Sequence, residues 1–122
     1  MTRKVENVGI GGVYATFEID KTDDEFDLTA EDEGSAVALS GDNETDHGAD
    51  DDPFLGQLVS VQDDIAVVQV KGVVRAPYDA TAAPVLGGAV AVNGVGKVKA
   101  AASGRGFVIA LDATAETADV LL

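Results

Sequence analysis

Apolar and polar side chains alternate along residues 13–19, which read VYATFEI. Val13, Ala15, Phe17 and Ile19 fall on one side of an extended chain, whereas Tyr14 and the two polar residues fall on the other. An alternation with a period of two is typical of a half-buried β-strand. We therefore expect a strand over residues 13–19.

Short apolar stretches follow at strand-like intervals of roughly 8–12 residues. They occupy residues 34–40, 54–61, 65–70, 73–74, 85–92, 95–100, 107–111 and 117–122. Gln62-Asp63-Asp64 predicts a hairpin between two of these stretches, Asn93-Gly94 predicts a tight turn, and residues 75–84 read as a loop between two prolines. The pattern predicts an all-β fold, namely a small β-barrel or β-tulip-like domain with an extended N-terminal arm.

Charge divides the chain into two parts. Residues 1–53 carry 16 acidic and three basic side chains, whereas residues 54–122 carry six acidic and five basic ones. Gly9, Gly11 and Gly12 favour a flexible arm, residues 20–33 favour a linker, and residues 41–52 read as a solvated acidic loop. We expect an N-terminal arm and acidic linker over residues 1–33, followed by a β-barrel domain over residues 34–122.

The composition changes the picture in one respect. The formal net charge is −14, Asp is the commonest acid, and the apolar residues are mainly Val and Ala. Such a bias is typical of proteins adapted to high salt, where a Debye length of about 3 Å at 1 M screens self-repulsion. An ordinary protein with a locally acidic loop remains the alternative.

Several classes of partner are not expected. The eight Lys and Arg residues are scattered, although phosphate binding requires them in clusters, so no nucleic acid is predicted as a partner. No stretch approaches the ~20 apolar residues of a membrane helix, and none resembles the apolar core of a signal peptide. The chain has no Cys, so disulfides and thiolate chemistry are excluded.

Catalytic and metal-binding motifs are incomplete. The single histidine, His47, lies in the acidic loop, and no serine stands in a G-x-S-x-G pattern. The carboxylates of residues 42–52 could gather Ca²⁺ or Mg²⁺, but His47 and Pro53 stand where an EF-hand needs Gly and Glu. Gly94-Val95-Gly96-Lys97-Val98 lacks the other residues of a phosphate loop. We expect no enzyme, no metal site, no cofactor and no small-molecule substrate.

Residues 34–122 resemble a capsid decoration (cement) protein of a tailed virus. The resemblance is carried by the order of GSAVALSGDN (34–43), DPFLGQLVSV (52–61), VQVKGVV (68–74), PVLGGAVAV (84–92), GKVKAA (96–101) and GRGFVIALDATAETADVLL (104–122). The acidic residues 20–33 and the enlarged loop 41–52 depart from the family pattern. Together with the salt-type composition, the resemblance implies a virus of a halophilic archaeon.

The resemblance implies a structural virion protein on the outer surface of the capsid, where it stabilises the shell. Its expected partner is the major capsid protein, and its expected state is a homotrimer. An N-terminal arm would pair with a shell strand, so the expected capsid-binding residues are Arg3, Lys4, Val13, Tyr14, Phe17 and Ile19. A fibre- or receptor-associated binding module on a virion or cell surface is the alternative, and a small carboxylate enzyme is a third hypothesis.

Overall fold

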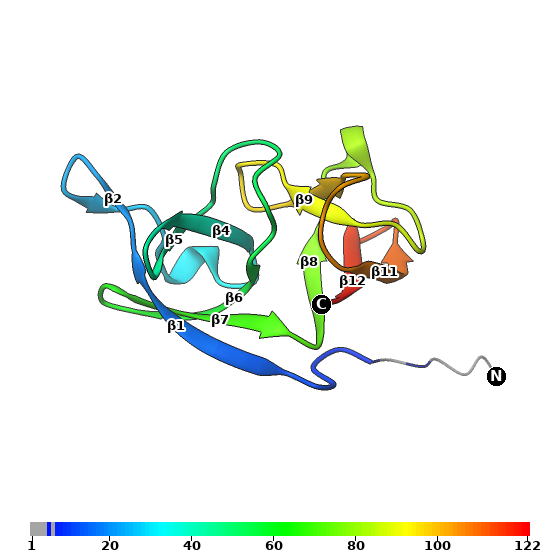
Figure 1. The fold of residues 1–122 in the computed structure, drawn as a ribbon, viewed down its shortest axis with the longest axis horizontal. Helices are drawn as coiled ribbons and strands as arrows, with labels where there is room; N and C mark the ends of the chain where they lie inside the picture. Colours follow the sequence, from blue (N-terminus) through cyan, green and yellow to red (C-terminus); the bar gives the residue numbers. More distant parts are fainter. Residues whose placement is uncertain (1–4, 6) are drawn as a thin grey trace.

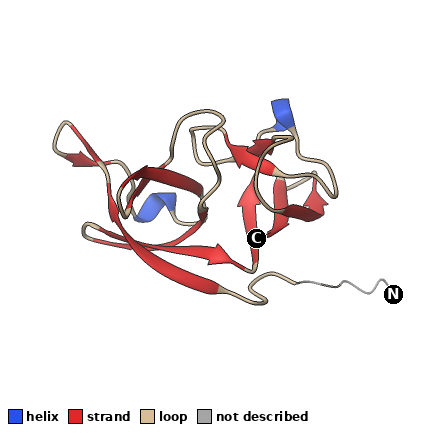
Figure 2. Ribbon diagram, viewed as in Figure 1, coloured by secondary structure: helices blue, strands red, loops and turns tan. Residues whose placement is uncertain are grey.

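The computed structural model describes residue 5 and residues 7–122, and these residues form two β-structures side by side (Figure 1). Five of the described strands close into a barrel: β1 (Val13–Ile19), β4 (Ala36–Gly41), β5 (Glu44–Asp46), β6 (Gly56–Gln62) and β7 (Ile65–Lys71). Helical structure in this part of the chain is limited to the 3-10 turns η1 (Ala30–Asp32) and η2 (Ala80–Ala82) (Figure 2). The prediction of an all-β fold with a small barrel is confirmed.

Next to the barrel lies a second group of strands. β8 (Val73–Pro77), β12 (Thr117–Leu121) and β11 (Phe107–Asp112) form a three-stranded antiparallel sheet in which β12 is central. β9 (Val90–Val92) and β10 (Val98–Ala100) form a two-stranded sheet. The expected loop over residues 75–84 is partly wrong, because Arg75 and Pro77 belong to β8 and pair with Asp119 and Thr117 of β12.

The strand order in the barrel is β1-β5-β4-β6-β7. All neighbours in this order are antiparallel except β1 and β5, which are parallel and pair only at Glu18↔Glu44 and Ile19↔Thr45. β6 and β7 form the predicted hairpin, and Asp63 in its turn has a φ of 53°. Gln62↔Ile65 is the last pair before this turn.

Two apolar clusters make up the core, and β4 lies between them. Val37 packs into the barrel cluster, whereas Ala36 and Ala38 pack into the other one. The barrel cluster contains Ile19, Leu28, Val37, Leu58, Ala66 and Val68. The second cluster includes Phe54, Val74, Val90, Val92, Val98, Val108 and Val120. Because both faces of β4 are buried, the barrel and the second group of strands are packed together across it.

The first strand does not belong to a free arm, which corrects the expectation for residues 13–19. β1 pairs with β7 from Val13↔Lys71 to Glu18↔Ile65, and its last residue, Ile19, is buried in the barrel core. The expected boundary at residue 34 therefore does not separate an arm from the barrel. The alternating pattern explains why this strand joins the barrel. It places Phe17 and Ile19 on one face, and that face packs against the apolar interior of the barrel.

The two acidic segments are also more ordered than expected. Residues 20–33 contain the hairpin of β2 (Lys21–Thr22) and β3 (Glu25–Phe26), then η1 with a Thr29–Asp32 capping box. Leu28 between them is 1% exposed. Residues 41–52 contribute β5, where Thr45 is fully buried and its hydroxyl donates to the carbonyl oxygen of Ala38 at 2.6 Å. Single apolar or uncharged residues anchor each segment.

Candidate functional site

The expected capsid-binding residues separate into three groups. Arg3 and Lys4 lie outside the described residues. Phe17 and Ile19 face the barrel interior, where Ile19 is buried and Phe17 is half-buried. Val13 and Tyr14 remain exposed, at 50% and 53%. Along β1, only the side chains of its first residues and the polar ones between the inward positions can meet a partner.

The outer edge of β1 is open over most of its length. β5 reaches only Glu18 and Ile19, and no strand besides β5 and β7 pairs with β1 among the residues that the structure describes. The segment before β1 bonds to the opposite side, since Gly9 N–H donates to Val73 O at 2.8 Å and Val73 N–H donates to Ile10 O at 3.0 Å. Residues 13–17 therefore present a free strand edge.

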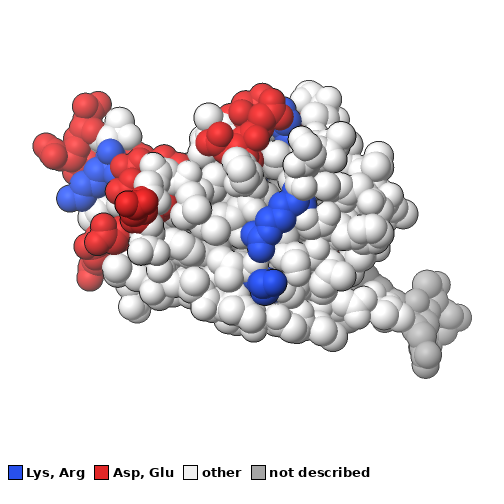
Figure 3. Space-filling model, viewed as in Figure 1, with Lys and Arg blue, Asp and Glu red and all other residues white. Residues whose placement is uncertain are grey.

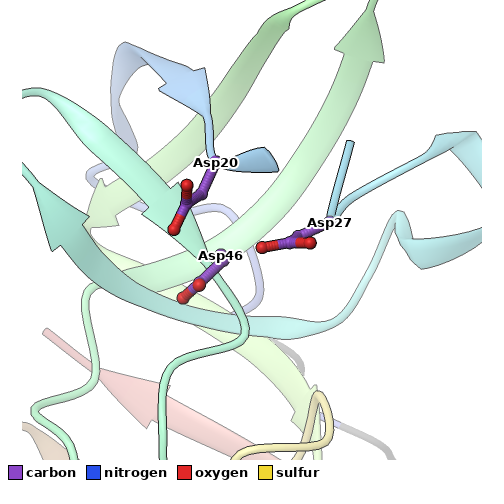
Figure 4. A group of neighbouring side chains, drawn as sticks. All are labelled: Asp20, Asp27 and Asp46. Carbon is purple, nitrogen blue, oxygen red and sulfur yellow. The ribbon is translucent and has the colours of Figure 1, made fainter. Parts of the chain in front are cut away.

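Three carboxylates meet where the β2–β3 hairpin joins the barrel (Figure 4). Asp20 follows β1, Asp27 follows β3 and Asp46 ends β5, and one oxygen of each lies within 4.8 Å of the other two. At the base of the hairpin, the backbone N–H of Asp27 donates to the backbone carbonyl oxygen of Asp20 at 2.9 Å and so joins the two ends of the hairpin. All three side chains are half-buried, and carboxylate oxygens are the ligands that hard cations such as Ca²⁺ prefer.

Burial raises the pKa of Asp46 above its ordinary value, and the charges of Asp20 and Asp27 raise it further. Two groups act in the opposite direction: the N–H of Gly48, which donates to Asp46 Oδ1 at 2.6 Å, and His47. The ionised cluster is therefore a point of mutual repulsion in the fold. Asp46 is one of the carboxylates of residues 42–52 that were expected as possible cation ligands, whereas Asp20 and Asp27 lie in a segment expected to be a linker and no motif pointed to them.

His47 does not belong to a catalytic triad. Its Nε2 lies 3.3 Å from Asp32 Oδ1, and its Nδ1 is buried without a hydrogen-bond partner. The hydroxyl of Ser35 and the imidazole of His47 both lie next to Gly96. Among the described residues, however, no hydrogen bond joins a serine hydroxyl to His47. A nucleophile and its base must be within hydrogen-bond reach of each other, and this pair is not.

The acidic loop is held by a lysine of the second group of strands. Lys99 Nζ lies 2.8 Å from Asp51 Oδ1 and 2.9 Å from Asp50 Oδ1. Hydrogen bonds to Asp51 and Asp50 raise the pKa of Lys99. The loop expected to be simply solvated is thus tied to β10, although both carboxylates remain exposed.

A shallow hollow lies on the outer face of the β11-β12-β8 sheet. It is lined by Val5, Ala110, Leu111, Thr117 and the ion pair of Arg75 with Asp119, in which Arg75 Nε donates to Asp119 Oδ1 at 2.8 Å. Asp119 is almost fully buried, and Arg75 Nη2 donates to its second oxygen at 3.2 Å. Because Arg75 binds both oxygens of this carboxylate, we interpret Asp119 as a structural residue that links β8 to β12, and not as an acid–base group.

Charge is distributed unevenly over the molecule. Residues 1–71, which include all five barrel strands, carry eighteen acidic and four basic side chains, whereas residues 72–122 carry four of each. Figure 3 shows the acidic side chains over the left end and the upper middle of the visible face, whereas the right part of that face is almost uncharged. Large apolar side chains are exposed in both parts, among them Val13 and Tyr14 in the acidic part and Val85, Leu86 and Phe107 in the neutral part.

Comparisons with known proteins add no assignment: no protein-family model matches the chain, and no curated protein matches it. In the part of the chain that the structure describes, no helix is long and apolar enough to cross a membrane.

Proposed function

We propose that this chain is a structural virion protein that binds the outer surface of an assembled capsid and stabilises the shell, with the major capsid protein as its partner. The observation that carries the proposal is the polarity of the molecule. The whole net charge of −14 lies on residues 1–71, residues 72–122 are neutral, and apolar side chains are exposed in both parts. Exposed apolar surface of this kind can attach to a shell while the acidic side chains around it stay hydrated.

The remaining support comes from the resemblance of residues 34–122 to capsid decoration proteins and from the nature of the fold. Two packed β-structures that share β4 form a stiff body. Within the described residues, His47 is paired with Asp32, and no hydrogen bond joins it to a serine hydroxyl as a nucleophile–base pair would require. A homotrimer belongs to the same proposal, because several weak contacts made together add through effective concentration.

The test is to purify particles from the cells that produce this chain and to count its copies. We expect it to sediment with the capsids at roughly one copy per shell subunit, and to appear as density on the outer surface in cryo-electron microscopy. Its absence from purified particles would overturn the proposal. A few copies per particle would instead favour a fibre- or receptor-associated module.

A further inference from the structure

The backbone of β1 has hydrogen-bonding groups that point away from the barrel. Ile19 N–H donates to Asp64 O at 2.9 Å on the β7 side, whereas Glu18 N–H donates to Asn43 O at 2.8 Å on the opposite side. These directions alternate along a strand. The N–H and C=O groups of Tyr14 and Thr16 therefore face the side of Glu18, where β5 no longer reaches.

The inward side chains next to this edge are incompletely covered. Ile19, which β5 flanks, is 4% exposed, whereas Phe17 and Ala15, which lie beyond β5, are only half-buried. A strand added next to residues 13–17 would cover these two side chains as β5 covers Ile19. The free backbone edge and the half-buried side chains of Ala15 and Phe17 would both be satisfied by the same ligand. That ligand is an extended segment with apolar side chains at alternate positions.

Natural proteins usually protect such edges with proline, lysine or an inward-pointing charge. Residues 13–17 of β1, VYATF, contain none of these. The irregularity between Val13 and Tyr14 lies at the first residue of the edge and leaves residues 14–17 regular. The edge is about 17 Å long at 3.4 Å per residue, which is sufficient for a short strand.

Charge differs between the two ends of the edge. Glu18, Asp42 and Glu44 lie at the end where β5 begins, since Glu18 pairs with Glu44 and the β4–β5 turn holds Asp42. Lys71 pairs with Val13 at the other end. An added strand would continue the line of β5 and would meet the three carboxylates with one of its ends.

We infer that the free edge of β1 accepts an extended segment of the shell protein, which carries a Lys or Arg at the end that meets Glu18, Asp42 and Glu44. This inference rests on the proposed function and specifies its attachment. In this arrangement the shell protein contributes the added strand, and the barrel of this protein receives it. The expected arrangement was the reverse, in which a loose arm of this protein pairs with a strand of the shell. A second copy of β1 fits less well, because residues 13–19 contain no Lys or Arg that could meet the three carboxylates.

The experiment compares Thr16→Pro with Thr16→Val in the full chain, using capsid shells that have been stripped of the protein and are then reconstituted. Proline removes the outward N–H of Thr16 but no hydrogen bond to β7, and valine keeps that N–H with a similar shape. We expect Thr16→Pro to weaken shell binding about tenfold or more. This change corresponds to the loss of about one backbone hydrogen bond to the added strand, together with poorer packing of that strand next to Thr16. Thr16→Val is expected to bind like the parent protein.

A second measurement requires no variant. The amides of Tyr14 and Thr16 are expected to exchange with deuterium rapidly in the free protein and at least about tenfold more slowly on the shell, as edge amides do when they acquire a partner. Unchanged exchange on the shell, or full binding by Thr16→Pro, would overturn the inference and leave the proposed function standing. Failure of the parent protein to bind shells would overturn both, and β1-to-β1 dimers of the free protein would identify a second copy as the occupant instead.

Discussion

At the scale of single residues, Arg105 joins the two halves of the molecule. Its Nη1 donates to the carbonyl oxygens of Phe54 (3.1 Å) and Leu55 (2.6 Å), and its Nη2 donates to Val70 O at 2.6 Å. The backbone of Arg105 also forms a β-bridge with Val90, the first residue of β9. Burial lowers the pKa of the guanidinium, but an arginine remains charged in proteins, so it continues to donate to all three oxygens.

Replacement of Arg105 by Met is expected to lower the free energy of unfolding by about 2–4 kcal/mol, because three partly buried carbonyl oxygens lose their donor. Arg105→Lys is expected to recover only part of this loss, since an ammonium group lacks the planar fork of the guanidinium. Urea unfolding followed by circular dichroism measures both variants. Equal stability of Arg105→Met and the parent protein would show that water replaces the guanidinium without loss.

Asp79 organises the loop that precedes β9 and β10. Its carboxylate accepts from the Thr81 hydroxyl (2.6 Å), the Asn93 amide (3.1 Å) and the Thr81 N–H (2.9 Å), and these bonds lower its pKa from 3.8 to about 2. A carboxyl group with a lowered pKa in the folded state stabilises the protein above its unfolded pKa. That contribution is lost as the pH falls towards about 2.

We therefore expect the Asp79 carboxyl resonance to titrate with a midpoint near pH 2, and the amide resonances of Thr81 and Val95 to move with it. Val95 is included because its N–H donates to the Asn93 side chain that Asp79 holds. In Asp79→Asn, the same amides are expected to lack this transition. A midpoint near 4 in the parent protein would mean that the three hydrogen bonds do not persist in solution.

At the scale of strands, Gly56 allows β6 to approach β7. A Cβ atom at this position would collide with the carbonyl oxygen of Gln69, a backbone atom of the neighbouring strand. Gly41 in β4 is different, because its nearest neighbour, at 2.9 Å, is the end of the flexible Glu44 side chain. The two glycines have the same chemistry but very different surroundings.

Gly56→Ala is expected to lower the free energy of unfolding by more than about 3 kcal/mol, because the β6–β7 pair must separate locally. Gly41→Ala is expected to change it by less than about 1 kcal/mol, since the Glu44 carboxylate can move away. Both values come from chemical denaturation under identical conditions. Similar losses in the two variants would contradict the importance of the close approach.

The strands that could be predicted are those with a local signal. The alternation of residues 13–19 and the hairpin around Asp63 are visible in the sequence because neighbouring residues determine them. β5 and the β2–β3 hairpin could not be found in this way, since charged residues surround one or two buried anchors such as Thr45 and Leu28. For the same reason the meeting of Asp20, Asp27 and Asp46 required the fold, because their strands approach only once the barrel is closed.

The position of β1 illustrates a second limit. Its pattern fits a strand of this chain's own barrel and a strand donated to a partner equally well, because both bury one face. The choice depends on β7, whose residues from Ile65 to Lys71 pair along its length. A sequence pattern predicts that a strand forms, but it does not identify the strand that lies next to it.

At the scale of the whole molecule, the concentration of net charge on residues 1–71 opposes folding of the barrel in dilute buffer. We expect the melting temperature to rise steadily as KCl increases from 0.05 to about 2 M, where the Debye length falls to a few ångströms. The double variant Asp20→Asn, Asp46→Asn is expected to show a smaller rise, because it removes two charges of the half-buried cluster. A melting temperature that is independent of salt would contradict adaptation to high salt.

The pairing of strands far apart in the chain has a consequence for the order of folding events. Phe17 of β1 pairs with Ala66 of β7, and Val73 of β8 pairs with Leu121 of β12. The residues of each pair are separated by about 50 positions in the sequence. On a ribosome, residues 13–17 of β1 therefore have no strand partner until β7 has emerged, because β5 pairs only with Glu18 and Ile19, and β8 has no strand partner until β12 is made. Topologies with such remote pairings fold slowly, so the uncharged VYATF segment of a nascent chain stays available to other strands until β7 pairs with it.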